Sequence, residues 1–229
     1  MLDKSLQSAE RRMQIEEIAA LFNLLFSSST SVYHQATSFY YGGSEPYYQS
    51  WSRTASRLVQ PARLISREDF PSSALHEISH WCIAGIVRRS QDDFAYWYQP
   101  EGRSEQNQQR FYQAERIPQA IECLFSKSAG ITFRPSFDDF NDSEQSETMR
   151  RRFVRSVDLQ VAEFRKKPER LPYRARIFLA NLKKASSAGL IKVKTQKHEE
   201  YMLSRFVDES QAKRFFSSSL VEPFNHIAL

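Results

Sequence analysis

The pentapeptide His76-Glu77-Ile78-Ser79-His80 carries two imidazoles four positions apart, with a carboxylate next to the first. Residues four apart on a helix differ by about 40° around its axis, so both rings point to the same side. Two such imidazoles are suitable ligands for zinc, iron or a similar divalent ion. With only 5 histidines in 229 residues, an HExxH pattern arises by chance roughly 0.01 times in a chain of this composition. We therefore interpret His76 and His80 as metal ligands; the alternative is a polar cluster inside a helix.

Two histidines do not complete a metal site, so a third ligand must come from another segment. A carboxylate is the expected type, because the other histidines lie in remote parts of the chain. Glu115 is the first candidate and Glu122 the second. They are seven positions apart and so on one face of a helix, although Pro118 lies between them. The alternative for Glu115 is an exposed acid on a helix surface.

Glu77 has two chemical roles open to it. In a zinc peptidase of the HExxH class, this glutamate is the general base that takes a proton from metal-bound water. In an oxygenase it orients a histidine, or acts as an acid or base beside the open side of the metal. We assign Glu77 as catalytic, and the residue types alone leave both roles open.

Other chemistry-bearing patterns in the sequence are weaker. His198-Glu199-Glu200 with His226 follows the ligand order of jelly-roll iron oxygenases, but the surrounding segment shows no strand pattern. Cys82 and Cys123 lack CxxC spacing and are expected to be small buried side chains. The sequence has no GxSxG motif, glycine-rich phosphate loop or CxxC pair, which gives no support to serine hydrolases, nucleotide enzymes or zinc ribbons.

The histidine pair must lie on a helix, and the flanking residues predict one over about 71–87. Pro71 suits the first turn of a helix, and the apolar Leu75, Ile78 and Ile83 recur at helical spacing. Pro118 is expected to bend or break the helix that carries Glu115, because proline removes a backbone donor.

The remaining elements follow from apolar periodicity, caps and turn residues. We predict further helices over about 8–27, 104–128, 143–167 and 172–185, short strands over 32–37, 62–65 and 94–98, and a Gly42-Gly43 loop. The pattern is not a βαβ alternation. It predicts an α+β fold, a mostly helical single domain with a few short strands and a metallopeptidase-like HExxH helix, and not a jelly-roll barrel.

Composition and charge divide the chain into a domain and an extension. Residues 1–187 are predicted to be the metal-binding domain, and 188–229 a basic extension, partly helical at about 198–217 or mobile. No apolar run approaches the length of a membrane span, and Cys82 and Cys123 are the only cysteines, which together predict a cytoplasmic protein.

The charge is uneven along the chain. Residues 151–229 hold 17 Lys and Arg against 8 Asp and Glu, whereas residues 1–150 hold 15 against 19. A basic second half is typical either of a solvated helix face or of a surface that binds an acidic macromolecule or RNA.

Longer strings around the motif carry a resemblance to a known family. Residues 75–85 (Leu-His-Glu-Ile-Ser-His-Trp-Cys-Ile-Ala-Gly), Arg88-Arg89, residues 93–103 (Asp-Phe-Ala-Tyr-Trp-Tyr-Gln-Pro-Glu-Gly-Arg) and Pro118-Gln119-Ala120 resemble the elongation factor P hydroxylase family. The resemblance extends from about residue 10 to residue 186 and is most specific over 75–134.

This resemblance implies a non-haem iron enzyme that hydroxylates the β-lysylated lysine of bacterial elongation factor P. It implies a site with iron (Fe²⁺) as cofactor and His76, His80 and Glu115 as ligands, another divalent ion being the alternative occupant in the purified protein. The target side chain is doubly cationic, so acids and aromatic rings are expected to bind it. Within the matching strings, we assign substrate binding to Asp93, Tyr96, Tyr98, Arg103 and Gln119.

Two competing functions stay open beside this reading. HExxH alone favours a zinc-dependent peptidase. A non-catalytic RNA or ribosome binder would instead use the basic second half. With elongation factor P in its lysylated form as the protein substrate, we expect no membrane association and no direct nucleic-acid partner.

Overall fold

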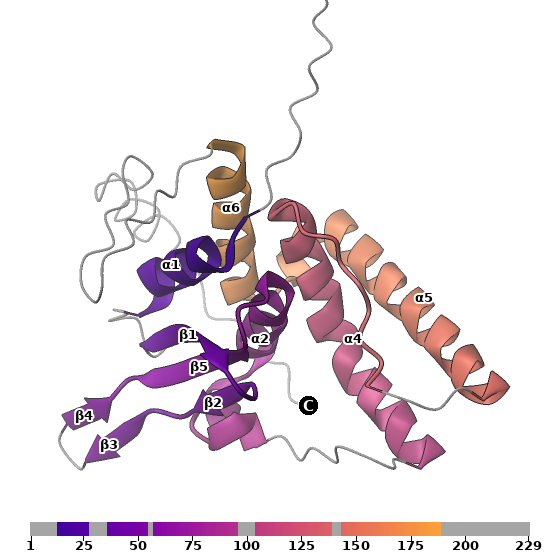
Figure 1. The fold of residues 1–229 in the computed structure, drawn as a ribbon, viewed down its shortest axis with the longest axis horizontal. Helices are drawn as coiled ribbons and strands as arrows, with labels where there is room; N and C mark the ends of the chain where they lie inside the picture. Colours follow the sequence, from indigo (N-terminus) through magenta and orange to yellow (C-terminus); the bar gives the residue numbers. More distant parts are fainter. Residues whose placement is uncertain (1–12, 28–35, 55–56, 96–103, 139–142, 189–229) are drawn as a thin grey trace, which may run out of the picture.

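The computed structural model describes residues 13–27, 36–54, 57–95, 104–138 and 143–188, and Figure 1 shows their arrangement. The helices are α1 (Ile15–Phe26), α2 (Pro71–Ile83), α3 (Ile86–Arg89), α4 (Glu105–Ser128), α5 (Glu144–Lys166) and α6 (Tyr173–Ala188). The strands are β1 (Thr37–Gly43), β2 (Tyr47–Gln49), β3 (Ser52–Thr54), β4 (Arg57–Gln60) and β5 (Ala62–Arg67), and short 3-10 helices lie at η1 (Asp92–Ala95) and η2 (Pro168–Arg170). The predicted α+β class, mostly helical and without a jelly roll among these residues, is confirmed.

The three-stranded sheet buries one face. Its order is β1-β5-β2, with β1 parallel and β2 antiparallel to the central β5. Phe39 and Tyr48 both lie opposite Leu64 in the register, and all three are buried. Neighbours on the other face, such as Arg63 and Tyr40, are exposed. This one-sided alternation is what a sheet covered by helices on a single face requires.

Helices α1 and α2 cover the sheet and meet in an aromatic core. The Trp81 ring of α2 lies 4.9 Å from the ring of Phe22 and 4.7 Å from that of Phe26, both on α1. Trp81 also donates its indole N–H to Thr37 Oγ1 on β1, at 3.2 Å. The histidine helix is therefore fixed to the sheet along the side that faces away from its histidines.

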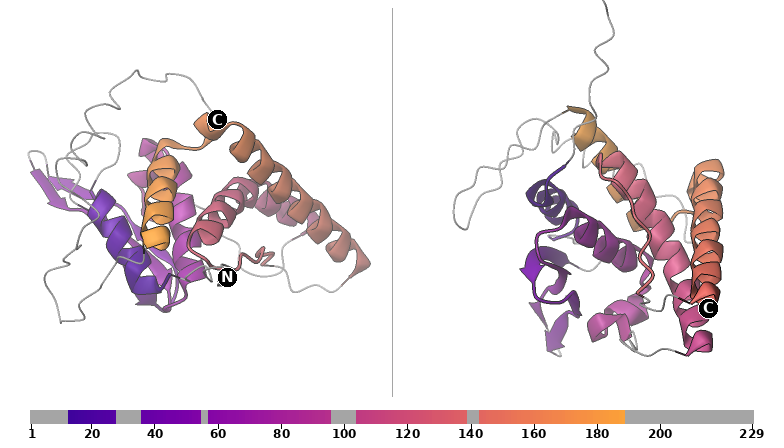
Figure 2. Two further views of the ribbon diagram at one scale, coloured as in Figure 1. Left: turned by 90° about the horizontal axis from the view of Figure 1, so that it is seen from above. Right: turned by 45° about the vertical axis from the view of Figure 1, so that its right-hand side comes forward.

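Helix α4 packs against the other side of α2, and α5 packs on the outside of α4 (Figures 1 and 2). Tyr112 of α4 stacks on Phe153 of α5, with ring centroids 4.6 Å apart. Helix α6 contacts α1, α2 and α4 and so closes the core from the end of the bundle. No helix within the described ranges is long and apolar enough to cross a membrane.

Several predicted boundaries need correction. The first helix begins at Ile15 rather than at residue 8, because Gln14 is its extended N-cap. Gly42-Gly43 was expected to be a loop, but both residues belong to β1, and Gly43 pairs with Arg67 at the end of β5. The strand expected over 32–37 lies mostly outside the described residues, and β1 starts only at Thr37. The strand over 62–65 is confirmed as part of β5.

The two helices of the candidate site also differ from expectation. The helix predicted over 71–87 ends at Ile83, and α3 follows after an extended break at Ala84 and Gly85. The helix predicted over 104–128 is α4, which continues from Glu105 through Pro118 to Ser128; of the predicted bend or break at Pro118, the break is wrong. The predicted helices 143–167 and 172–185 correspond closely to α5 and α6.

The strand expected over 94–98 is wrong where the structure describes it. Phe94 lies in η1, and both Asp93 and Phe94 have a positive φ. The cause is a contact with a distant part of the chain: Asp92 and Asp93 accept hydrogen bonds from the backbone N–H groups of Ser50, just after β2, and Tyr48, within β2. These bonds hold η1 as a turn against β2 instead of letting it extend. Residues 96–103 and 189–229 lie outside the described residues, so the predicted extension keeps the status of a prediction.

Candidate metal centre

Helix α2 presents its two histidines on the side opposite its core contacts. Ala74, Leu75, Ile78 and Trp81 are fully buried on the core side. The side chains of His76 and His80 keep 25% and 14% of their surface accessible. The apolar periodicity of the helix thus orients the pair toward α4 while leaving it partly open to solvent.

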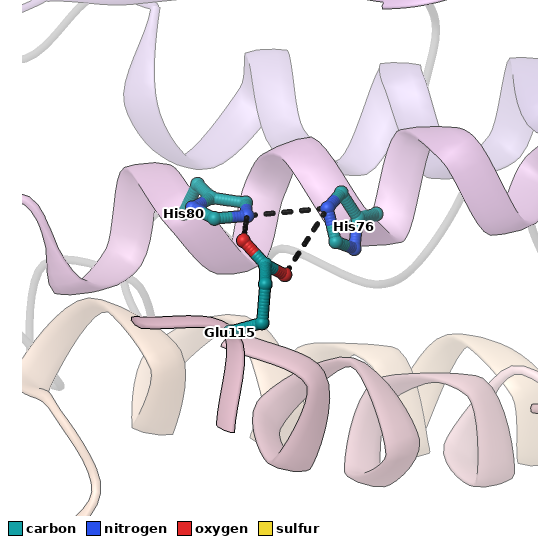
Figure 3. Close-up of side chains that lie close together, drawn as sticks. All are labelled: His76, His80 and Glu115. Carbon is teal, nitrogen blue, oxygen red and sulfur yellow. Dashed lines mark hydrogen bonds and ion pairs between the residues drawn. The ribbon is translucent and has the colours of Figure 1, made fainter. Parts of the chain in front are cut away.

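Glu115 of α4 meets both imidazoles. The helix begins at the cap residue Ser104, whose hydroxyl accepts the N–H of Asn107, and three turns later places the Glu115 side chain, 5% exposed, against α2. Glu115 Oε1 lies 3.3 Å from His80 Nε2, and Oε2 lies 3.8 Å from His76 Nε2. The two Nε2 atoms are 3.1 Å apart. Figure 3 shows the three side chains converging on one point.

The spacing of these donor atoms fits a divalent ion. Ligand atoms about 2.1 Å from one ion, at angles between square and tetrahedral, lie roughly 3.0–3.4 Å from one another. The distance of 3.1 Å between the two Nε2 atoms and that of 3.3 Å from His80 Nε2 to Glu115 Oε1 match this range, and the other carboxylate oxygen, Oε2, lies 3.8 Å from His76 Nε2. Among the described residues, the group that offers one ligand atom each within 4.8 Å of one another is His76, His80 and Glu115. Two imidazoles and one carboxylate form the ligand set of several zinc and non-haem iron enzymes.

Two further residues of α4, Glu122 and Gln119, form hydrogen bonds with members of this cluster. Glu122 Oε2 lies 2.8 Å from Nδ1 of His76, on the opposite edge of the ring from Glu115. Gln119 Nε2 donates to Glu115 Oε2 at 3.3 Å and to the carbonyl of Ser136 at 2.8 Å. The Gln119 Oε1 atom accepts the N–H of Ser136 at 3.1 Å, so its amide is fixed by the main chain on both sides.

The electrostatics of the cluster favour a cation. Burial lowers the pKa of His76, but the hydrogen bond and charge of Glu122, with the charges of Glu115 and Glu77, outweigh burial and raise it to about 10. Burial raises the pKa of Glu115, yet the charge and hydrogen bond of His80, with those of His76 and Gln119, lower it to about 2. Burial, together with the neighbouring carboxylates, raises the pKa of Glu77 despite the two histidines. Three acids around two imidazoles therefore stabilise positive charge at this point.

The residues predicted for the site are partly brought together. Glu77 lies beside the cluster and is only partly exposed. Gln119 is fully buried and contacts Glu115 directly. Asp93 lies on η1, where its Oδ1 accepts the N–H of Tyr48 at 2.8 Å. Tyr96, Tyr98 and Arg103 fall outside the described residues.

Sequence reasoning placed Glu122 only as an alternative ligand and missed the contact between Gln119 and Ser136. A signal was present in the spacing, because positions 115, 119 and 122 repeat at i, i+4 and i+7 and so share one helix face. That spacing places three polar side chains toward α2. It does not reveal which of them contacts Nδ1 of His76 and which faces the Nε2 atoms of the two histidines.

The fold and the site together define a class: a helical α+β protein whose HExxH helix and a neighbouring helix jointly present two histidines and one glutamate. Comparison with known proteins gives the family. Residues 21–196 match the family model described as elongation factor P hydroxylase. The chain is also 39% identical over 128 residues to the elongation factor P lysine hydroxylase of Haemophilus influenzae, covering 56% of this chain and 67% of that protein. The chain belongs to the elongation factor P hydroxylase family.

Proposed function

We propose that this protein is a non-haem iron monooxygenase that hydroxylates the β-lysylated lysine of elongation factor P. The observation that carries the proposal is the convergence of His76, His80 and Glu115 from two helices, within a member of this family. The Haemophilus influenzae relative is itself named as a lysine hydroxylase of elongation factor P, which supports the same substrate here.

The residues of the proposed site have distinct tasks. His76, His80 and Glu115 would hold iron (Fe²⁺), which when bound supplies the one-electron chemistry that dioxygen requires. Three protein ligands leave further positions on the ion open, and the partial exposure of both histidines gives access to them. We propose that Glu77, which is next to His76 in the sequence and whose pKa burial raises, holds or accepts a proton beside that open side.

The substrate side chain is doubly cationic, so its binding site should offer negative charge and aromatic faces. We propose that Asp93, Tyr96, Tyr98 and Arg103 contact it or the surrounding loop of the factor. Asp93 lies on η1, immediately before the segment that carries the other three. For Gln119, also predicted to bind substrate, the buried contact with Glu115 supports a role in orienting that carboxylate.

Metal analysis combined with the mass of the target tests this function. Protein purified without oxygen should contain iron, and lysylated elongation factor P incubated with it, dioxygen and a two-electron reductant should gain one oxygen atom by mass spectrometry, the second oxygen atom leaving as water. His76→Ala should remove both the metal and the mass gain, with a circular dichroism spectrum like that of the wild type. An unchanged target mass with fully iron-loaded wild-type protein would contradict the proposal.

A zinc-dependent peptidase is the second candidate, favoured by one observation: Glu77 lies beside both histidines, as the general base of an HExxH peptidase does. Incubating the zinc-loaded protein with peptide libraries separates the two candidates. Cleavage that Glu77→Gln abolishes would replace hydroxylation as the function. A non-catalytic RNA binder would keep its binding after His76→Ala.

A further inference from the structure

We propose that Glu122 is a positioning residue of the metal centre: it holds His76 with its proton on Nδ1, so that Nε2 offers a lone pair to the metal. The inference rests on the proposed function, because it concerns a metal held by His76, His80 and Glu115. In this proposal Glu122 forms a hydrogen bond with a ligand, His76, and is not itself a ligand.

The contact itself defines the role. Glu122 Oε2 lies 2.8 Å from His76 Nδ1, and the Glu122 side chain is only 7% exposed. An ionised carboxylate can only accept a hydrogen bond, so Nδ1 must donate. An ion that binds at Nε2 displaces the proton there, and the proton that remains on the ring stays on Nδ1 beside Glu122, so Nε2 directs its lone pair to the ion.

The other nitrogen of the His76 ring, Nε2, points toward His80 and Glu115. His76 Nε2 faces His80 Nε2 at 3.1 Å and Glu115 Oε2 at 3.8 Å. The tautomer that Glu122 selects is therefore the one that directs the lone pair of His76 toward the other two ligands. A hydrogen bond of this kind also fixes the ring plane and raises the basicity of the ligand.

One face of helix α4 provides two hydrogen bonds that orient ligands, one to Glu115 and one to His76. Glu115, Gln119 and Glu122 follow at i, i+4 and i+7, so one stripe provides a ligand, the residue that orients that ligand, and the residue that orients His76. Pro118 and Ala120, buried beside this stripe, pack the helix closely against its neighbours. The geometry of the centre thus depends on α4 as much as on the histidine motif of α2.

Two substitutions at Glu122 separate the hydrogen bond from the charge. Glu122→Leu removes the acceptor but keeps an apolar side chain of similar size. Glu122→Gln keeps an acceptor oxygen and removes the charge. The control is Glu105→Gln, an exposed acid in the first turn of the same helix, far along the chain from the cluster.

Zinc affinity, measured by competition with a chromophoric chelator, is the readout, because it is independent of hydroxylation. Losing a carboxylate that orients a metal-bound histidine typically costs about 10- to 100-fold in metal affinity. We expect that loss in Glu122→Leu, a smaller loss in Glu122→Gln, and wild-type affinity in Glu105→Gln. Thermal melting of the metal-free variants controls for folding.

Nitrogen-15 NMR of the zinc-loaded wild type adds a direct view of the ring. His76 should show a protonated Nδ1 and a metal-bound Nε2. Wild-type affinity in Glu122→Leu, or a metal-bound Nδ1, would overturn the assignment of Glu122 while leaving the metal site intact. Failure of the wild type to bind zinc or iron at all would instead overturn the proposed function.

Discussion

Glu77, Glu115 and Glu122 all interact with the histidine pair, but in different ways. Glu115 faces both Nε2 atoms, Glu122 meets the outer edge of His76, and Glu77 makes electrostatic contact with both rings. The roles that we propose for these chemically similar residues therefore differ by position: ligand for Glu115, orienting group for Glu122, and acid or base for Glu77. Substitution of each glutamate should therefore have a different effect.

Substitution of Glu77 should separate metal binding from catalysis. Glu77→Gln keeps the size of the side chain and removes its ability to take a proton, so we expect hydroxylation to fall by about 10²- to 10⁴-fold. Because Glu77 is not among the three converging donors, iron content should stay at the wild-type level. Parallel iron assay and target mass spectrometry measure both. Loss of iron in this variant would show that Glu77 supports the ligands and not the chemistry.

The two cysteines should differ in reactivity. Cys82 is buried at 3% exposure, and burial raises the pKa of its thiol to about 12 although Arg174 and Arg89 oppose the shift. Thiolate therefore forms in the folded protein only as the pH approaches 12, instead of near the ordinary value of 9. At pH 8 we expect iodoacetamide to modify the half-buried Cys123 slowly and to leave Cys82 intact.

Peptide mapping by mass spectrometry identifies the modified cysteine, and the same reaction in denaturant serves as the control, since both thiols should then react. Because the folded state holds the Cys82 proton more tightly than the unfolded state, this thiol also makes the protein less stable as the pH rises from about 9 toward 12. Rapid labelling of Cys82 at pH 8 would contradict its burial.

At the scale of elements, the end of the histidine helix depends on a residue from α6. The buried Arg174 donates to three carbonyls where α2 ends, those of Trp81, Cys82 and Ala84, at 2.5–3.0 Å. Its guanidinium also lies 4.6 Å from the centre of the Trp81 ring. A cation at a helix C-terminus is favourable, and here it ties α6 to the turn of α2 that carries His80.

Arg174→Met should lower the free energy of unfolding by about 3 kcal/mol, because the carbonyls of Trp81 and Cys82 lose their charged donor, while that of Ala84 keeps the hydrogen bond from Arg89. Arg176→Met is the matched control: Arg176 is exposed on the same helix, so its loss should stay within about 0.5 kcal/mol. Urea denaturation of the two variants measures the difference. Equal stability would show that the carbonyls find other donors.

Two glycines give a second paired test. A Cβ at Gly43 would lie 2.8 Å from Ile65 Cγ2 and 2.9 Å from the carbonyl oxygen of Glu45, whereas a Cβ at Gly85 meets nothing within 4 Å. Gly43→Ala should therefore destabilise the protein by about 1–3 kcal/mol through overpacking at the end of β1. Gly85→Ala should be neutral or slightly stabilising. Thermal unfolding compares the two, and the same melting temperature for both would contradict the close packing at Gly43.

How far the sequence predicts these elements depends on whether their causes are local. Helices α5 and α6 were predictable because caps and periodicity lie within the segment itself. The η1 turn was not, because its conformation is set by hydrogen bonds that Asp92 and Asp93 accept from the backbone N–H groups of Ser50 and Tyr48, more than forty residues away. The sequence Gly42-Gly43 likewise has the composition of a turn, but the pairing of Gly43 with Arg67 in the parallel β1–β5 pair depends on contacts between distant segments.

The same division applies to the site. The spacing of His76 and His80 predicts two rings on one side of a helix, since that follows from helix geometry alone. The approach of Glu115 to these rings depends on how α4 packs against α2, and the sequence could only rank it above Glu122. The rotation of α4 about its own axis decides which carboxylate faces Nε2 of His76 and which contacts Nδ1. This rotation is known only from the packed structure.

At the scale of the whole molecule, the charge is distributed unevenly relative to the site. The cluster of His76, His80 and Glu115 lies between α2 and α4. The basic residues of the second half begin on α5, which lies on the far side of α4 (Figure 1). The outer surface of α5 exposes Arg151, Arg152 and Arg155. A surface of this kind favours acidic macromolecular partners and speeds their approach.

We expect this surface to contribute to binding of the protein substrate, so that association weakens as salt rises. Charge reversal by Arg152→Glu together with Arg155→Glu should slow association by about tenfold at low ionic strength, and the difference should shrink near 0.5 M salt as screening sets in. Arg63→Glu with Arg67→Glu is the matched control, because it changes the net charge equally on the exposed side of β5, away from α5. Stopped-flow or surface-plasmon measurement with lysylated elongation factor P gives both rates. If the two double variants slow association equally, net charge alone steers the encounter; if neither does and salt has no effect, the basic residues of α5 are a solvated helix face and the substrate is recognised at the metal centre alone.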